Sequence, residues 1–190
     1  MFEHADIAAK QPPFMTDSQG AAADTLILAL GSPLRGDDGA GLAALERLRQ
    51  LDDLPENITL FEGGEYDLMT ILLTGDYKRV LIVDAADFGG APGEWIFSTS
   101  KDIEFIADDV KLSKTLHNAS LSEVLALCEV LGITLPEIVI YGIQPQDMCW
   151  SPGLSEPVEE AVQEVCEHIS RSFYKTTRGW RKDNLPWQRS

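Results

Sequence analysis

Short apolar segments alternate with amphipathic ones through the middle of this 190-residue chain. The segments predicted to be strands are 25–30, 57–62, 79–84, 94–99 and 137–143. Three of them are continuous apolar runs, which is typical of strands buried on both faces of a parallel sheet.

Between and after these strands, apolar residues recur at helical spacing. The predicted helices cover about 41–48, 66–73, 120–131 and 155–173. Asp37 or Asp38 is expected to cap the first of them, and Ser120 with Glu123 forms a capping box for the third. Strands that alternate with helices predict an α/β fold, with a twisted, mostly parallel five-stranded sheet flanked by helices on both faces.

The two ends of the chain differ from this pattern. Residues 1–24 show no sustained period and are expected to be a mobile leader, so the ordered domain should cover 25–174. Residues 175–190 form a basic tail with five Lys or Arg against one Asp, and they also carry Trp180 and Trp187. The length suits one domain with a full core.

The net charge of −16 argues against nucleic acid or an anionic membrane as a partner. It serves solubility, or it matches a basic segment of a partner protein. The three cysteines, Cys128, Cys149 and Cys166, form no CxxC pair, so neither a disulfide framework nor a zinc ribbon is indicated. Without a signal pattern or a membrane-length apolar run, a cytoplasmic protein is predicted.

Acidic residues follow three of the predicted strands. Asp37 and Asp38 stand in the glycine-rich turn after the first strand, Glu62 ends the second and Asp84 ends the third. Parallel strands bring these ends to one edge of the sheet, where ligands bind in α/β folds. Two adjacent carboxylates would repel a phosphate, so this edge suits a metal ion or a proton transfer. A helix cap is the alternative role for each lone acid.

His117 precedes the third predicted helix, in a loop. With Asp38 and Glu62 it makes a set of two carboxylates and one imidazole, which suits a divalent transition metal with open positions. The alternative is a solvated loop histidine. His168 is interpreted as a surface or helix-end residue, and His4 lies in the leader.

A dinucleotide site is a competing interpretation, because residues 39–44 fit the GxGxxG/A fingerprint. That fingerprint should begin directly after its strand, whereas here it starts nine residues beyond Leu30 and behind two carboxylates. The sequence contains no HExxH motif, no GxSxG elbow and no phosphate-binding P-loop.

Five sequence blocks follow one another within about residues 25–174. Residues 31–41 match G-N-x-L-x-x-D-[DE]-G-x-G with Ser32 for Asn, and residues 62–64 match D-G-G with Glu62 for Asp. Residues 83–85 with 92–93 match V-D-A and P-G, and His117 precedes a leucine-rich helix. Residues 142–145 with 153–155 match G-[IV]-x-P and G-L-[ST]. In this order the blocks resemble those of the hydrogenase maturation endopeptidases.

The resemblance implies a phosphorylase/hydrolase-like fold and places Asp38, Glu62 and His117 at the metal-contacting positions of the family. It implies an endopeptidase that removes the C-terminal extension of a nickel–iron hydrogenase large-subunit precursor after nickel insertion. The nickel would be carried by that precursor rather than held permanently by the enzyme. Asp38 is the candidate catalytic general base, in a reaction without a covalent nucleophile, and the free enzyme is expected to be a monomer.

Glu62 moves the presumed ligand carboxylate one methylene outward from the usual aspartate. This departure, together with the unusual tails, keeps a second hypothesis open. The chain would then be a non-catalytic checkpoint or scaffold that binds a metalloprotein precursor without cutting it.

Overall fold

The computed structural model describes residues 24–52, 54–99 and 127–174. Their elements, in chain order, are β1 (Thr25–Ala29), the 3-10 helix η2 (Gly36–Gly39), α1 (Ala40–Arg49), β2 (Ile58–Glu62), α2 (Glu65–Thr74), β3 (Arg79–Ala85), β4 (Trp95–Thr99), β5 (Glu137–Ile143) and α5 (Glu156–Tyr174). Residues 127–131 are also helical. No helix among the described residues is long and apolar enough to cross a membrane.

The strands form a single five-stranded sheet in the order β2-β1-β3-β5-β4. The pairs β2–β1, β1–β3 and β3–β5 are parallel, and β4 is antiparallel to β5. Every residue of the interior strand β1 is buried, whereas the edge strands β2 and β4 are mostly half-buried. The continuous apolar runs therefore belong to strands that are covered on both faces.

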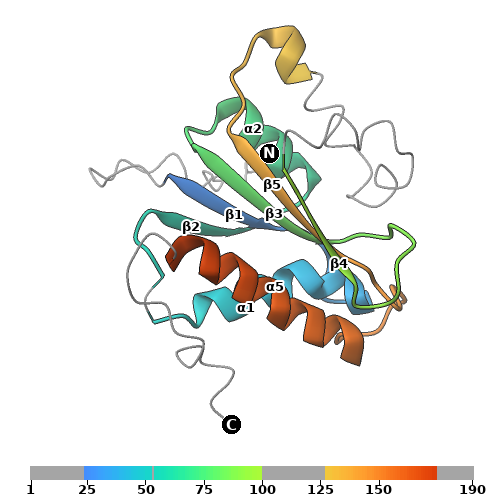
Figure 1. The fold of residues 1–190 in the computed structure, drawn as a ribbon. Helices are drawn as coiled ribbons and strands as arrows, with labels where there is room; N and C mark the ends of the chain where they lie inside the picture. The colour runs from blue at the N-terminus through green and yellow to red at the C-terminus, as the bar shows by residue number, and fades with distance from the viewer. Residues whose placement is uncertain (1–23, 53, 100–126, 175–190) are drawn as a thin grey trace, which may run out of the picture.

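Helices cover both faces of this sheet (Figure 1). Helices α1 and α5 lie side by side on one face, and α2 lies on the other. Because successive side chains of a strand point to opposite faces, Ile27 and Ala29 of β1 enter the core under α1 and α5, while Leu26 and Leu28 enter the core under α2.

Gly41 sets how closely α1 lies over the sheet. A Cβ atom at this position would collide with the carbonyl oxygens of Val83 and Leu30. Helix α1 therefore begins directly above the ends of β1 and β3, which brings the segment before it to the carboxyl edge of the sheet.

The predicted fold class is confirmed, and each predicted strand forms with bounds that agree to within one residue. The predicted cap of α1 is wrong. Asp37 and Asp38 lie in η2, Gly39 occupies the N-cap of α1, and neither helix has a side-chain cap. The reason is that the Asp37 carboxylate binds a distant loop instead. Residues 1–23 of the leader, the tail and most of the predicted helix at 120–131 lie outside the described residues.

Candidate active site

Asp38 lies at the carboxyl edge of the sheet, where β1 passes into η2. Its side chain is completely buried, at 0 % exposure. The turn between β1 and η2 depends on Gly31, whose φ of +118° is a conformation that favours glycine. A Cβ atom on Gly31 would overlap the carbonyl oxygen of Asp38. The turn therefore holds the Asp38 backbone tightly against the end of β1.

Asp84 is a second buried carboxylate at this edge, also at 0 % exposure. It is one residue from the end of β3, and its Oδ1 lies 3.9 Å from the point that a Gly31 Cβ would occupy. The Asp84 carboxylate and the Asp38 backbone thus both adjoin Gly31. A carboxylate is costly to remove from water, so two of them buried at one strand edge indicate a site that the fold is built to hold.

Asp37 acts as an anchor rather than as an open ligand. Its Oδ2 accepts hydrogen bonds from the backbone N–H groups of Gln146 and Asp147 (2.8 and 2.9 Å) and from Ser155 Oγ (2.9 Å). Its Oδ1 accepts one from Ser155 N–H (2.6 Å). The Asp37 N–H in turn donates to the Asp147 carbonyl (2.9 Å). These bonds fix η2, and with it Asp38, to the loop between β5 and α5.

Glu62 ends β2 at the same edge of the sheet. It pairs with Ala29 of β1, which pairs on its other side with Val83 of β3. Neighbouring strands are about 4.8 Å apart, so Glu62 and Val83 are separated by about 10 Å across the sheet. Glu62 differs from the buried aspartates because its side chain is exposed. This edge therefore combines a buried carboxylate with one that faces solvent.

The structure thus brings Asp38 and Glu62 to one edge, as the sequence predicted. His117 lies outside the described residues, so its place beside them stays a prediction. Within the described ranges, no group of three or more His, Cys, Asp or Glu side chains is arranged to hold a metal ion.

Gln144 is a positioning residue that the analysis of the sequence did not single out. Its Oε1 accepts hydrogen bonds from the N–H groups of Phe88 (3.0 Å) and Gly90 (3.1 Å), and its Nε2 donates to Asp87 Oδ1 (3.1 Å). The side chain fixes the loop after β3 at the candidate edge. In the sequence, only its place in the Gly-Ile-Gln-Pro block at residues 142–145, which matches a motif of the family, pointed to it.

The interpretation of His168 as a surface or helix-end residue is wrong. The residue lies well inside α5 and is half-buried between this helix and the sheet. Its Nδ1 is 3.0 Å from the hydroxyl oxygen of Tyr141, and the rings of Trp95 and Phe97 each lie 5.4 Å from its own. Burial raises the pKa of Tyr141 to about 12. His168 is part of the packing between α5 and the sheet.

Comparison with known sequences identifies the family. The sequence model of the hydrogenase maturation proteases matches residues 42–172. The chain belongs to the hydrogenase maturation protease family. A putative hydrogenase maturation protease of Methanocaldococcus jannaschii is 35% identical over 154 residues, which are 77% of this chain and 94% of that protein. The hydrogenase expression/formation protein HupD of Bradyrhizobium diazoefficiens is 28% identical, over 72% of this chain and 71% of its own.

Solved structures of hydrogenase maturation proteases agree with this family assignment. The Hydrogenase 3 maturation protease has 30% identity and a TM-score of 0.60, with 77% of this chain and 88% of that chain covered. The [NiFe] hydrogenase maturation protease HycI of Thermococcus kodakarensis has 26% identity and a TM-score of 0.60, with coverages of 78% and 91%. Membership in this family confirms the resemblance that was inferred from the sequence. It also confirms the predicted fold and a protease function in hydrogenase maturation.

Proposed function

We propose that this chain is an endopeptidase that removes the C-terminal extension of a nickel–iron hydrogenase large-subunit precursor after nickel insertion. The observation that carries the proposal is the fully buried Asp38, at the carboxyl edge of the sheet of a hydrogenase maturation protease. The nickel belongs to the precursor and enters the site as part of the substrate.

Asp38 is the proposed general base. A carboxylate held beside the scissile peptide takes a proton from the attacking water, whose oxygen bonds to the carbonyl carbon. The carbon–nitrogen bond then breaks, and the proton passes to the departing amine. Asp37 and Gly31 support this role, because the anchor and the tight turn hold the Asp38 backbone in one position.

Contact with the nickel of the precursor is assigned to Asp38, Glu62 and His117. Carboxylate and imidazole ligands suit a divalent transition metal, and the exposed Glu62 is accessible to a protein substrate docked at this edge. A metal held between enzyme and precursor anchors the substrate and polarises a carbonyl or activates water. On this basis we infer a metal-dependent reaction.

We also infer a cytoplasmic enzyme that is a monomer when free. The cysteines Cys128, Cys149 and Cys166 are free thiols, which fits a reducing compartment.

The test is the processing of a nickel-loaded precursor by purified Asp38→Asn, followed by mass spectrometry. The asparagine keeps the size of the side chain but cannot act as a base, so cleavage should fall by at least about 100-fold, the usual contribution of a general base. Asp52→Asn is the matched control, because Asp52 is an exposed aspartate beyond the other end of α1. Cleavage at the normal rate by Asp38→Asn would refute the assigned role.

The same assay tests the scaffold hypothesis, which rests on the glutamate at position 62 together with the unusual tails. A precursor that binds the wild-type chain and loses no mass would identify a checkpoint rather than a protease. If the protease proposal holds, Glu62→Gln should lose cleavage, while Glu62→Asp, which restores the usual residue of the family, should keep it.

A further inference from the structure

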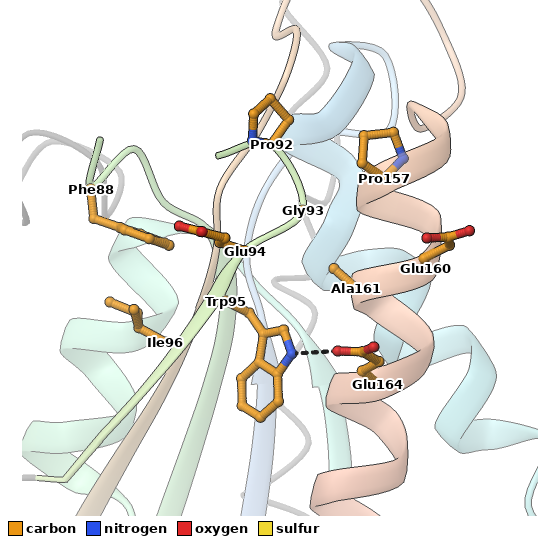
Figure 2. A pocket seen from close by; sticks show the side chains of 10 residues that line it. All are labelled: Phe88, Pro92, Gly93, Glu94, Trp95, Ile96, Pro157, Glu160, Ala161 and Glu164. Atoms are coloured by element: carbon orange, nitrogen blue, oxygen red, sulfur yellow. Dashed lines mark hydrogen bonds between the residues drawn. The ribbon is translucent and has the colours of Figure 1, made fainter. Parts of the chain in front are cut away.

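An acidic groove runs between the edge strand β4 and helix α5. It consists of two hollows of about 530 and 470 Å³. Trp95, Glu160 and Glu164 line both hollows, so the two adjoin and form one groove, here called the β4–α5 groove. Figure 2 shows its upper part, with Trp95 reaching from β4 toward Glu164 on α5.

The charge of the groove is almost wholly negative. Its lining carries the carboxylates of Glu94, Glu160, Glu164 and Glu167 against a single guanidinium, that of Arg171. Arg171 already pairs with Glu167 at 3.2 Å. Glu94, Glu160 and Glu164 are exposed, so these three carboxylates are accessible to a bound segment.

The ring of Trp95 lies beside these carboxylates. The indole N–H of Trp95 donates to Glu164 Oε2 at 3.0 Å, which fixes the ring against the helix. Guanidinium and ammonium groups bind aromatic faces and carboxylates together, so a groove of this composition fits a basic segment.

The chain itself supplies a segment of that composition. Residues 175–190 carry five Lys or Arg against one Asp, which leaves 10 basic residues against 30 acidic ones in the rest of the chain. They begin directly after Tyr174, where α5 ends. The 16 residues span up to about 53 Å when extended. The 19 residues of α5 are only about 28 Å long, so the segment can turn back and reach the whole groove.

We propose that residues 175–190 bind in the β4–α5 groove of their own chain. The basic side chains pair with Glu160 and Glu164 and lie over the ring of Trp95. Covalent attachment favours this occupant over any free peptide, because a short tether gives an effective concentration of about 1 mM. The inference goes beyond the proposed protease function and does not depend on it.

The test measures binding of a fluorescein-labelled peptide with the sequence of residues 175–190 to the full-length chain, by fluorescence anisotropy. The binding chain carries Arg178→Gln, Arg181→Gln and Lys182→Gln, so that its own tail no longer competes. Adding Glu160→Gln and Glu164→Gln to this chain should abolish binding. The pair Glu56→Gln and Glu129→Gln is the matched control, because it removes two exposed carboxylates outside the groove and should leave binding unchanged.

Competition by the attached tail gives the decisive comparison. If the free peptide binds with a Kd of about 0.1 mM, a tail at about 1 mM effective concentration should weaken its binding to the wild-type chain by about tenfold. The indole ¹⁵N–¹H resonance of Trp95 should also differ between the wild-type chain and the tail variant.

Three results would overturn the proposal. One is the absence of peptide binding to the tail variant, and another is binding that survives Glu160→Gln with Glu164→Gln. The third is equal affinity for the wild-type and tail-variant chains with an unchanged Trp95 resonance. That result would mean that the attached tail leaves the groove open, and a basic segment of another protein would then be its occupant.

Discussion

Replacement of Asp37 should destabilise this protein more than replacement of any exposed acid near it, because one carboxylate accepts four hydrogen bonds from the loop between β5 and α5. In Asp37→Asn, the amide nitrogen can face only one of the two oxygen positions. Turning it toward Ser155 N–H sacrifices one bond at Oδ1 and keeps the three donors at Oδ2. The loss of that bond and of the negative charge should cost about 1.5–3 kcal/mol.

Asp37→Ala removes all four bonds and leaves the N–H groups of Gln146, Asp147 and Ser155 without their acceptor. Each donor that water cannot reach costs about 1–3 kcal/mol, and these hydrogen bonds are part-buried, so Asp37→Ala should cost more than Asp37→Asn, or about 3 kcal/mol. This is a large share of the about 5–15 kcal/mol that stabilises a typical domain.

Urea unfolding followed by circular dichroism measures both values. Asp147→Asn is the matched control, since this exposed carboxylate accepts a hydrogen bond from Cys149 N–H (2.8 Å) within its own loop, and it should change stability by less than about 1 kcal/mol. Hydrogen exchange of residues 144–155 should rise in both Asp37 variants. If the free energy of unfolding of Asp37→Asn lay within about 0.5 kcal/mol of the wild-type value, the role of Asp37 as an anchor would be refuted.

Two further predictions concern the same edge of the sheet. Gly31→Ala should abolish folding or precursor cleavage, because the new Cβ would overlap the Asp38 carbonyl at a φ of +118°; a normal melting temperature with full cleavage would contradict this. The hydrogen bond and negative charge of Asp147 raise the pKa of the exposed Cys149 thiol, so at pH 8 less of it is thiolate. Asp147→Asn should therefore speed its reaction with Ellman's reagent, with the gain shrinking as pH rises above the pKa; an unchanged rate at pH 8 would show that Asp147 does not control this thiol.

Much of the fold is predictable from the sequence because its signal is local. Three of the five strands are continuous apolar runs and the other two are short apolar-rich segments, so the limits of all five agree with the structure to within one residue. Sequence spacing does not reveal the direction of β4. An edge strand can join in either direction, and this one pairs antiparallel to β5.

The candidate site is predictable only where strand ends determine it. Asp38, Glu62 and Asp84 meet at one edge because they follow three neighbouring strands. The role of Asp37 was missed, since its partners are 109 to 118 residues away and most of them are backbone groups that carry no signature. The position of His168 was predicted wrongly for a similar reason. This residue lies on α5, and its neighbours Trp95 and Tyr141 come from strands β4 and β5, which are distant in the sequence.

The bonds of Asp37 also have a consequence for synthesis of the protein. A nascent chain that has not yet emerged as far as Ser155 has Asp38, the proposed general base, but not the segment to which the neighbouring Asp37 is bonded. Strand β5, which lies between β3 and β4, is likewise among the last parts to be translated. The candidate edge of the sheet can therefore reach its final arrangement only after the chain has been made as far as the start of α5.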